Sequence, residues 1–319
     1  MSFKKVVLAG GGVLGSQIAY QSAYCGFDVT IWLRSEESVG RCKPKVERLH
    51  GIYIQTLEAF KSQLGDPMAV RMFPRGLYPN PEDLTVEKID QLKADADRAF
   101  ENIKYETDME AAFADADFVI EAMAENPQAK IDFYQAIAKY LPEKTVLATN
   151  SSSMLPSTFA QYTGRPEKYL ALHFANNIWK GNTAEIMGHP GTEQKYYDEV
   201  VKFAEEIRMV PLCLKKEQPG YIINSMLIPF LNAGQQLLAK EVADFETIDK
   251  TWRICTGAPL GPFQILDVVG LTTAYNVVMN NPDAKDPESV NGKIAAILKE
   301  RIDAGKTGIN DGEGFYKYK

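Results

Sequence analysis

The stretch Lys4-Lys5-Val6-Val7-Leu8-Ala9-Gly10-Gly11-Gly12-Val13-Leu14-Gly15 decides the fold of this chain. An apolar, β-branched run leads into Gly-x-Gly-x-x-Gly, and an apolar helical pattern follows. Gly10 permits a tight turn, Gly12 lets the backbone approach a pyrophosphate, and Gly15 lets the helix pack on the strand. Free N–H groups and the dipole at the helix N-terminus favour phosphates. We therefore predict a dinucleotide site at Gly10, Gly12, Val13, Leu14 and Gly15, with an ordinary glycine-rich turn as the alternative.

Strand and helix patterns alternate through the first two thirds of the chain. Apolar runs predict further strands at residues 28–33, 117–122, 145–149, 169–174 and 209–214. Helical patterns fall at residues 36–64, 129–141 and 193–207. Such alternation is typical of an α/β fold with a mostly parallel, doubly wound sheet of the Rossmann type.

Two segments interrupt this order. Residues 65–97 carry four prolines and then an acidic, helix-like stretch, which we interpret as an excursion from the main domain rather than a core element. Residues 215–220, Lys-Lys-Glu-Gln-Pro-Gly, form a charged junction, after which the pattern is helical. We predict an NAD(P)-binding domain over residues 1–216 and an all-helical domain over 217–319. The apolar stretch at 221–240 is either a dimer surface or a plain core helix.

The composition excludes several classes of protein. The chain has 319 residues and a net charge of −7, which argues against a nucleic-acid binder. The sequence has no apolar run long enough for a bilayer and no targeting segment, so we expect no membrane partner and a cytoplasmic location. Its four cysteines form no CxxC pair, so we expect neither a metal site nor disulfides.

The end of the second predicted strand bears on the choice of dinucleotide. NAD-binding sheets usually carry an acid there to hold the ribose hydroxyls, but this chain reads Leu33-Arg34-Ser35. An arginine suits a 2′-phosphate. We therefore favour NADP, with Arg34 and Ser35 among the cofactor-binding residues. The alternative is an exposed arginine on a chain that binds NAD.

Polar side chains at two other strand ends point to acid–base chemistry. Residues 150–153, Asn-Ser-Ser-Ser, follow one strand, although serines in such turns also serve as helix caps. His173 ends the next strand, and Glu185 lies in a stretch that can return beside it. A carboxylate on one imidazole nitrogen fixes the tautomer and raises the basicity of the other nitrogen. A dehydrogenase needs such a pair, because the alcohol proton leaves as the hydride does; the alternative is a structural histidine.

Several motifs in order resemble the 3-hydroxyacyl-CoA dehydrogenase family. Besides the glycine turn and Glu185, they are Glu-Ala-Met-Ala-Glu-Asn at 121–126, Asn-Ser-Ser at 150–152, His-Phe-Ala-Asn at 173–176, Pro-Gly-Tyr-Ile-Ile-Asn at 219–224, Gly-Pro-Phe at 261–263 and Gly-Glu-Gly-Phe-Tyr at 312–316. The resemblance covers nearly the whole chain except residues 65–97. It implies a nicotinamide-dependent oxidoreductase of fatty acid metabolism that forms a homodimer through its helical domain.

The resemblance also implies roles for single residues. His173 resembles the general acid/base, and Glu185 resembles the carboxylate that orients it. The groups that resemble substrate-binding side chains are Ser152 and Asn224, which would hydrogen-bond the substrate oxygen, and Asn176. The remaining cofactor-binding assignments are Glu125 and Lys130, near the nicotinamide ribose, and Asn150.

The chain departs from the family pattern in the substrate wall as well as at Arg34. Asn177 and Trp179 replace prolines, and Asn182 replaces a lysine, which implies a changed substrate. Within the family, the sequence most resembles the diketoreductase branch, in residues 173–176, 182–185, 251–254 and 267–276. We predict a 3-hydroxyacyl-CoA dehydrogenase acting on a 3-hydroxy or 3-oxo acyl substrate, with a CoA thioester as the first candidate. The alternatives are a CoA-independent keto acid or ester reductase, of the diketoreductase or gulonate dehydrogenase type, and a non-catalytic crystallin-like or nucleotide-sensing protein.

Overall fold

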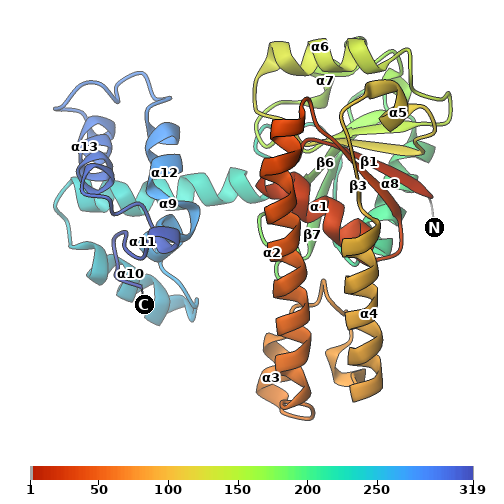
Figure 1. Ribbon diagram of the computed structural model, residues 1–319. Coiled ribbons are helices and arrows are strands. Elements are labelled where there is room, and N and C mark those ends of the chain that lie inside the picture. The colour runs from red at the N-terminus through yellow and green to blue at the C-terminus, as the bar shows by residue number, and fades with distance from the viewer. Residues whose placement is uncertain (1–2, 319) are drawn as a thin grey trace. The chain divides into compact units, whose positions relative to one another are not determined.

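The computed structural model describes residues 3–318 and divides into two compact units, one ending at Ile222 and the other beginning at Ile223 (Figure 1). The sequence placed this boundary after residue 216. The first unit holds a sheet covered by helices, and the second unit is built from helices.

The first unit contains one eight-stranded sheet in the order β3-β2-β1-β4-β5-β6-β7-β8. The strands are β1 (Lys5–Ala9), β2 (Asp28–Trp32), β3 (Lys104–Glu106), β4 (Phe118–Glu121), β5 (Val146–Thr149), β6 (Tyr169–Phe174), β7 (Thr183–Met187) and β8 (Val210–Leu214). The strands from β3 to β6 pair in parallel, β7 runs antiparallel to β6, and β8 runs parallel to β7. This confirms the predicted α/β sheet and adds two strands that are not among the predicted ones. They are β3, which no sequence pattern indicated, and β7, whose stretch was expected only to return beside the strand of His173.

Helices cover both faces of the sheet because alternate side chains of each strand point to opposite faces. Val6 and Leu8 belong to one buried cluster, with helices α1 (Val13–Tyr24), α2 (Glu36–Lys61), α4 (Val86–Asn102) and α8 (Gln194–Glu206). Val7 and Ala9 belong to another cluster, with α5 (Met109–Phe113) and α6 (Pro127–Ile137). The unit also holds two short α-helices, α3 (Pro67–Met72) and α7 (Pro156–Phe159).

The segment 65–97 differs from the expected excursion, because much of it packs into the core. Its apolar residues Phe73, Leu77, Ile89 and Leu92 are buried in the same cluster as the strands, and α4 packs against α1 and α2 (Figure 1). The period of three to four between the buried residues of α4 gives the helix one apolar face, and that face explains the packing.

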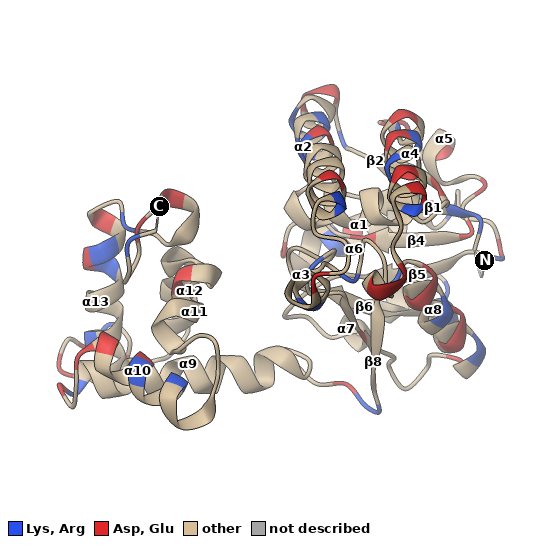
Figure 2. Cartoon of the chain, turned by 90° about the horizontal axis from the view of Figure 1, so that it is seen from below, with Lys and Arg blue, Asp and Glu red and all other residues tan. Residues whose placement is uncertain are grey.

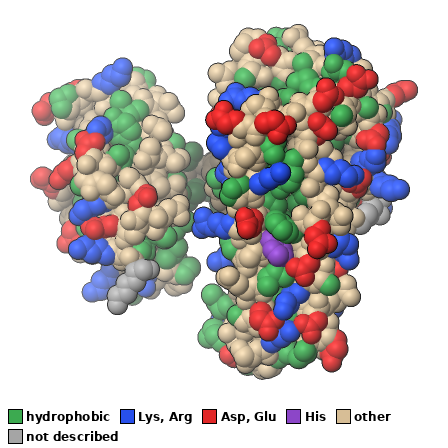
Figure 3. All heavy atoms as spheres, in the orientation of Figure 1, with side chains coloured by type: hydrophobic (Ala, Val, Ile, Leu, Met, Phe, Trp, Pro, Cys, Tyr) green, Lys and Arg blue, Asp and Glu red, His purple; other side chains and the backbone are tan. Residues whose placement is uncertain are grey.

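Ion pairs join the outer parts of α2 and α4. Lys93 pairs with Glu58 at 2.6 Å and Lys61 pairs with Asp90 at 2.5 Å, and the His50 ring lies 2.8 Å from the Asp97 carboxylate. Acidic and basic residues are interspersed along both helices (Figure 2) and over the molecular face that carries them (Figure 3).

In the described part of the second unit, five α-helices pack around a separate apolar core. They are α9 (Ile223–Ala239), α10 (Phe245–Thr256), α11 (Pro262–Val269), α12 (Leu271–Val278) and α13 (Val290–Asp303). The buried carboxylate of Asp267 accepts hydrogen bonds from the backbone N–H groups of Phe315 and Tyr316, at 2.7 and 2.9 Å. These bonds fix the C-terminal segment on α11.

Candidate active site

The glycine turn leaves open space at the N-terminus of α1, and its place in the cofactor site stays a prediction. Gly10 has φ +117°, and a Cβ there would lie 2.6 Å from the carbonyl oxygen of Ala122, while a Cβ at Gly15 would collide with the carbonyl oxygen of Gly10. A Cβ at Gly12 would meet no atom within 4 Å. The space beside Gly12, at the N-terminus of α1, thus fits a dinucleotide phosphate. Val13 is exposed and Leu14 partly buried at the same end of the helix.

The end of β2 carries the residues on which the NADP prediction rests. Arg34 is exposed, and Ser35 caps α2 by accepting a hydrogen bond from the backbone N–H of Ser38. Glu36 and Glu37 follow in the first turn of α2. The local charge is therefore mixed, and the preference for NADP stays a prediction.

The β6–β7 pair brings the predicted acid/base residues together. His173 lies opposite Glu185 in the antiparallel register, and its Nδ1 is 3.0 Å from Glu185 Oε2. Its Nε2 lies 3.1 Å from Ser152 Oγ. His173 is 5% exposed and Glu185 3%, whereas Ser152 is exposed. The imidazole thus connects a buried carboxylate to a hydroxyl at the surface.

The turn after β5 is held by a carboxylate that the sequence assigned to the cofactor. Glu125 Oε1 accepts a hydrogen bond from the backbone N–H of Ser152 at 2.6 Å, and the Ser151 hydroxyl lies 2.8 Å from Glu125 Oε2. Asn150 Oδ1 accepts a hydrogen bond from the backbone N–H of Phe174 at 3.0 Å. These bonds fix Ser152 and the end of β6 relative to each other.

Lys130 lies in a buried network that sequence reasoning missed. Its Nζ is 2.6 Å from Glu121 Oε1 and 3.8 Å from Glu125 Oε2. The other oxygen of Glu121 accepts hydrogen bonds from Tyr134 and Thr149, at 2.9 and 2.7 Å. A carboxylate that ends the apolar strand Phe118–Glu121 is the sequence signal for this network, because a buried charge requires partners. The position of Lys130 beside a nicotinamide ribose stays a prediction.

The loop after β6 differs in part from the predicted substrate wall. Trp179 is buried, with its ring 5.9 Å from that of Tyr53, and Asn182 donates a hydrogen bond to the carbonyl oxygen of Arg208. Both departures from the family pattern thus serve internal packing. Asn176 and Asn177 are exposed, and the Asn177 backbone N–H donates to Gln17 of α1 at 2.8 Å. Asn224 lies at the start of α9, in the second unit, and its role stays a prediction.

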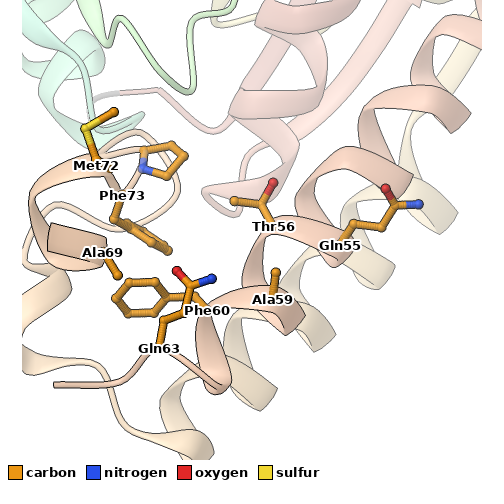
Figure 4. A pocket seen from close by; sticks show the side chains of 9 residues that line it. Gln55, Thr56, Ala59, Phe60, Gln63, Ala69, Met72 and Phe73 are labelled. Atoms are coloured by element: carbon orange, nitrogen blue, oxygen red, sulfur yellow. The ribbon is translucent and has the colours of Figure 1, made fainter. Parts of the chain in front are cut away.

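A pocket of about 380 Å³ lies between α2 and α3 (Figure 4). Its lining residues are Gln55, Thr56, Ala59, Phe60, Gln63, Ala69, Met72, Phe73 and Pro74. None of these can donate or accept a proton at neutral pH, so we do not place the chemistry there. Within residues 3–318 no group of three or more metal-ligating side chains gathers, and no helix has the length and apolarity needed to span a membrane.

The glycine turn and the His173–Glu185 pair define an oxidoreductase with an NAD-binding domain. Residues 82–218 match the NAD-binding domain of 3-hydroxyacyl-CoA dehydrogenase, and residues 220–318 match its C-terminal domain. The chain belongs to the 3-hydroxyacyl-CoA dehydrogenase family.

Three relatives illustrate the match. The chain is 29% identical to the mitochondrial hydroxyacyl-coenzyme A dehydrogenase of Rattus norvegicus, over 99% of this chain and 91% of that protein. It is 42% identical to a solved diketoreductase that acts on dicarbonyl compounds by substrate-directed dual catalysis, with full coverage of both chains and a TM-score of 0.82. The fold also matches (S)-3-hydroxybutyryl-CoA dehydrogenase from Ralstonia eutropha, at 24% identity, 99% coverage of both chains and a TM-score of 0.74.

Proposed function

We propose that this chain catalyses reversible hydride transfer between a nicotinamide dinucleotide and C3 of a 3-hydroxy or 3-oxo acyl compound. The observation that carries the proposal is the continuous contact from Glu185 through His173 to Ser152. The nicotinamide, when bound, supplies or accepts the hydride. The non-catalytic alternative gains no support, because all three groups are present and in contact.

In the reductive direction His173 gives the proton that completes the alcohol. The substrate carbonyl oxygen takes this proton from Nε2 as C3 gains the hydride, and the Ser152 hydroxyl donates a hydrogen bond to the same oxygen. Glu185 accepts the Nδ1–H and stabilises the imidazolium before the proton leaves. In the oxidative direction Nε2 accepts the alcohol proton. Asn224 and Asn176 are proposed to hold the acyl oxygens.

We propose NADP as the favoured dinucleotide, on the charge of Arg34. The test compares NADPH with NADH in the wild type and in Arg34→Asp, by loss of nicotinamide absorbance. The aspartate should shift the preference toward NADH by about 10-fold or more, because it repels a 2′-phosphate and accepts hydrogen bonds from ribose hydroxyls. An unchanged ratio would remove Arg34 from the cofactor site.

The substrate class has two candidates. A CoA thioester follows from the family, and a CoA-free dicarbonyl compound is favoured by the 42% identity to the diketoreductase. The experiment measures turnover of acetoacetyl-CoA and of a diketo ester in parallel. Turnover of the thioester alone supports a 3-hydroxyacyl-CoA dehydrogenase. Turnover of the ester alone supports a diketoreductase, and turnover of neither contradicts the proposal.

We also propose a homodimer formed through the second unit. Several of its apolar side chains are exposed, which is unusual for a surface that stays in water. They include Met226, Ile228, Val242, Trp252, Ile254 and Val268. Sedimentation equilibrium should give twice the mass of the chain, and Ile254→Asp should shift the equilibrium toward monomer. A wild-type monomer at micromolar concentration would contradict the proposal.

A further inference from the structure

Tyr221 contacts the predicted catalytic histidine face to face. The ring centroids of Tyr221 and His173 are 4.3 Å apart, and the ring planes differ by 12°. Tyr221 is 1% exposed and has φ +54°. A bulky residue in the left-handed region is strained by about 1–3 kcal/mol and persists only where its surroundings impose it. The backbone therefore holds this ring against the imidazole at a cost.

The hydroxyl of Tyr221 reaches the serine turn. It donates a hydrogen bond to the carbonyl oxygen of Ser151 at 2.7 Å, one residue before Ser152. Burial raises the pKa of Tyr221, so the phenol stays protonated and remains a donor over the working pH range. The next residue, Ile222, contacts the partner of His173: its backbone N–H donates a hydrogen bond to Glu185 Oε1 at 2.8 Å.

Two consecutive residues thus contact His173, Glu185 and the residue before Ser152. The hydrogen bond to Glu185 fixes one point of the imidazole but leaves the ring free to tilt about that point. A flat neighbour at 4.3 Å limits the tilt and keeps Nε2 aimed at Ser152. The hydrogen bond from Tyr221 to Ser151 fixes the turn that carries Ser152, the residue that Nε2 contacts.

We propose that Tyr221 is a positioning residue for hydride transfer, whose ring sets the plane of the His173 imidazole and whose hydroxyl sets the turn that carries Ser152. This inference rests on the proposed function of His173, Glu185 and Ser152. It assigns the residue no contact with the substrate.

The test compares Tyr221→Leu with Tyr221→Phe. Leucine removes the flat face and the hydroxyl, so kcat should fall about 10-fold or more, because small misplacement of reacting groups is costly. The KM for the dinucleotide should stay within about 2-fold, since the glycine turn is untouched. Phenylalanine keeps the ring and should restore kcat to within about 3-fold of the wild type, which isolates the contribution of the hydroxyl.

Tyr24 offers a matched control. It is also 1% exposed, and its hydroxyl donates to a backbone carbonyl, that of Leu77, at 3.1 Å. Tyr24→Leu should lower the thermal midpoint and leave kcat of the folded fraction unchanged. If Tyr221→Leu does not fold, Tyr221→Met replaces it, because methionine fills the space without a flat face.

The outcomes separate this inference from the proposed function. A Tyr221→Leu enzyme with wild-type kcat, or a Tyr24→Leu enzyme with the same loss of kcat, overturns the positioning role. Full activity in His173→Ala overturns the proposed function itself. An inactive His173→Ala beside a fully active Tyr221→Leu overturns the inference alone.

Discussion

The first unit buries two pairs of a carboxylate and a nitrogen base. The pairs are similar in distance and burial but differ in their further contacts. Glu185 and His173 lie 3.0 Å apart and are 3% and 5% exposed, while Glu121 and Lys130 lie 2.6 Å apart and are 0% and 1% exposed. In each pair one residue lies at or next to the carboxyl end of a sheet strand, Glu121 in β4 and His173 in β6. Distance and burial alone would rank the lysine pair as the stronger candidate for chemistry.

The two pairs differ in the further contacts of Lys130 and His173. Lys130 meets a second carboxylate, Glu125, and both oxygens of Glu121 are occupied by protein groups. His173 instead presents Nε2 to Ser152, which is exposed. Under the proposed function, Nε2 can pass its proton to a substrate bound beside Ser152, whereas both oxygens of Glu121 are already occupied by protein groups. We call His173–Glu185 the open pair and Glu121–Lys130 the closed pair, because exposure of the next contact, rather than burial of the pair, distinguishes them.

Removal of the imidazole should have the largest effect. His173→Ala deletes the group that transfers the proton, so we expect kcat to fall about 10³-fold, within the usual range for general acid–base catalysis. Steady-state rates in both directions measure this. His189→Ala is the matched control, because the His189 ring bonds only a backbone carbonyl and a turn N–H. Equal losses of kcat in the two variants would contradict the proton-transfer role proposed for His173.

The Glu121–Lys130 pair should contribute to the free energy of unfolding rather than to kcat. Lys130→Met leaves the buried Glu121 carboxylate without its cation, which costs about 3–5 kcal/mol of unfolding free energy. Chemical denaturation measures the change. Addition of Glu121→Gln to the same chain should recover part of it, because the remaining buried group is then neutral. A raised KM for the dinucleotide with unchanged stability would instead support the ribose-binding role that the family resemblance implies.

Glu185→Gln should weaken the open pair without removing it. The carboxylate accepts hydrogen bonds from His173 and from the backbone N–H of Ile222, whereas an amide offers one acceptor oxygen. A donor that faces the amide nitrogen then loses its acceptor, and we expect kcat to fall roughly 10²-fold. A kcat equal to that of the wild type would show that the ring is oriented without the Glu185 carboxylate.

Local patterns predicted the open pair better than the closed one. The glycine turn and the strand of His173 are read from neighbouring residues, and Glu185 is near enough in sequence to return as the next strand. Glu121 takes Lys130 and Tyr134 from α6 and Thr149 from β5, so its partners depend on tertiary packing. Tyr221 is likewise 48 positions from His173 along the chain, and no periodicity indicates that the two rings stack.

The same limit applies to the fold. The apolar runs of the longer strands predicted the sheet, but β3 has only three residues and is defined by pairing with β2. The prolines of residues 65–97 obscured the apolar face of α4, whose place in the core is decided by the facing side chains of α2. Long-range contacts, rather than local propensity, settled both cases.

A third acid, Asp117, lies directly before β4, the strand that Glu121 ends, and its carboxyl is less buried than that of Glu121. Burial raises the pKa of the Asp117 carboxyl, but hydrogen bonds from Lys144 and from the backbone N–H groups of Lys5 and Lys4 outweigh burial and hold the pKa below its usual value. A depressed folded pKa stabilises the protein above the unfolded pKa of about 3.9, and the contribution is lost as the pH falls through the folded value.

Asp117→Asn should therefore have the smallest effect, and one that depends on pH. The amide oxygen can still accept the backbone N–H groups, and Lys144 is an exposed partner that contributes little. We expect a loss of about 1 kcal/mol at pH 7, shrinking toward zero below about pH 3. Urea unfolding of both proteins at the two pH values measures it. A loss that is the same at both values would mean that Asp117 acts through hydrogen-bond geometry alone, and its carboxylate would then differ from Glu121 in charge dependence as well as in exposure.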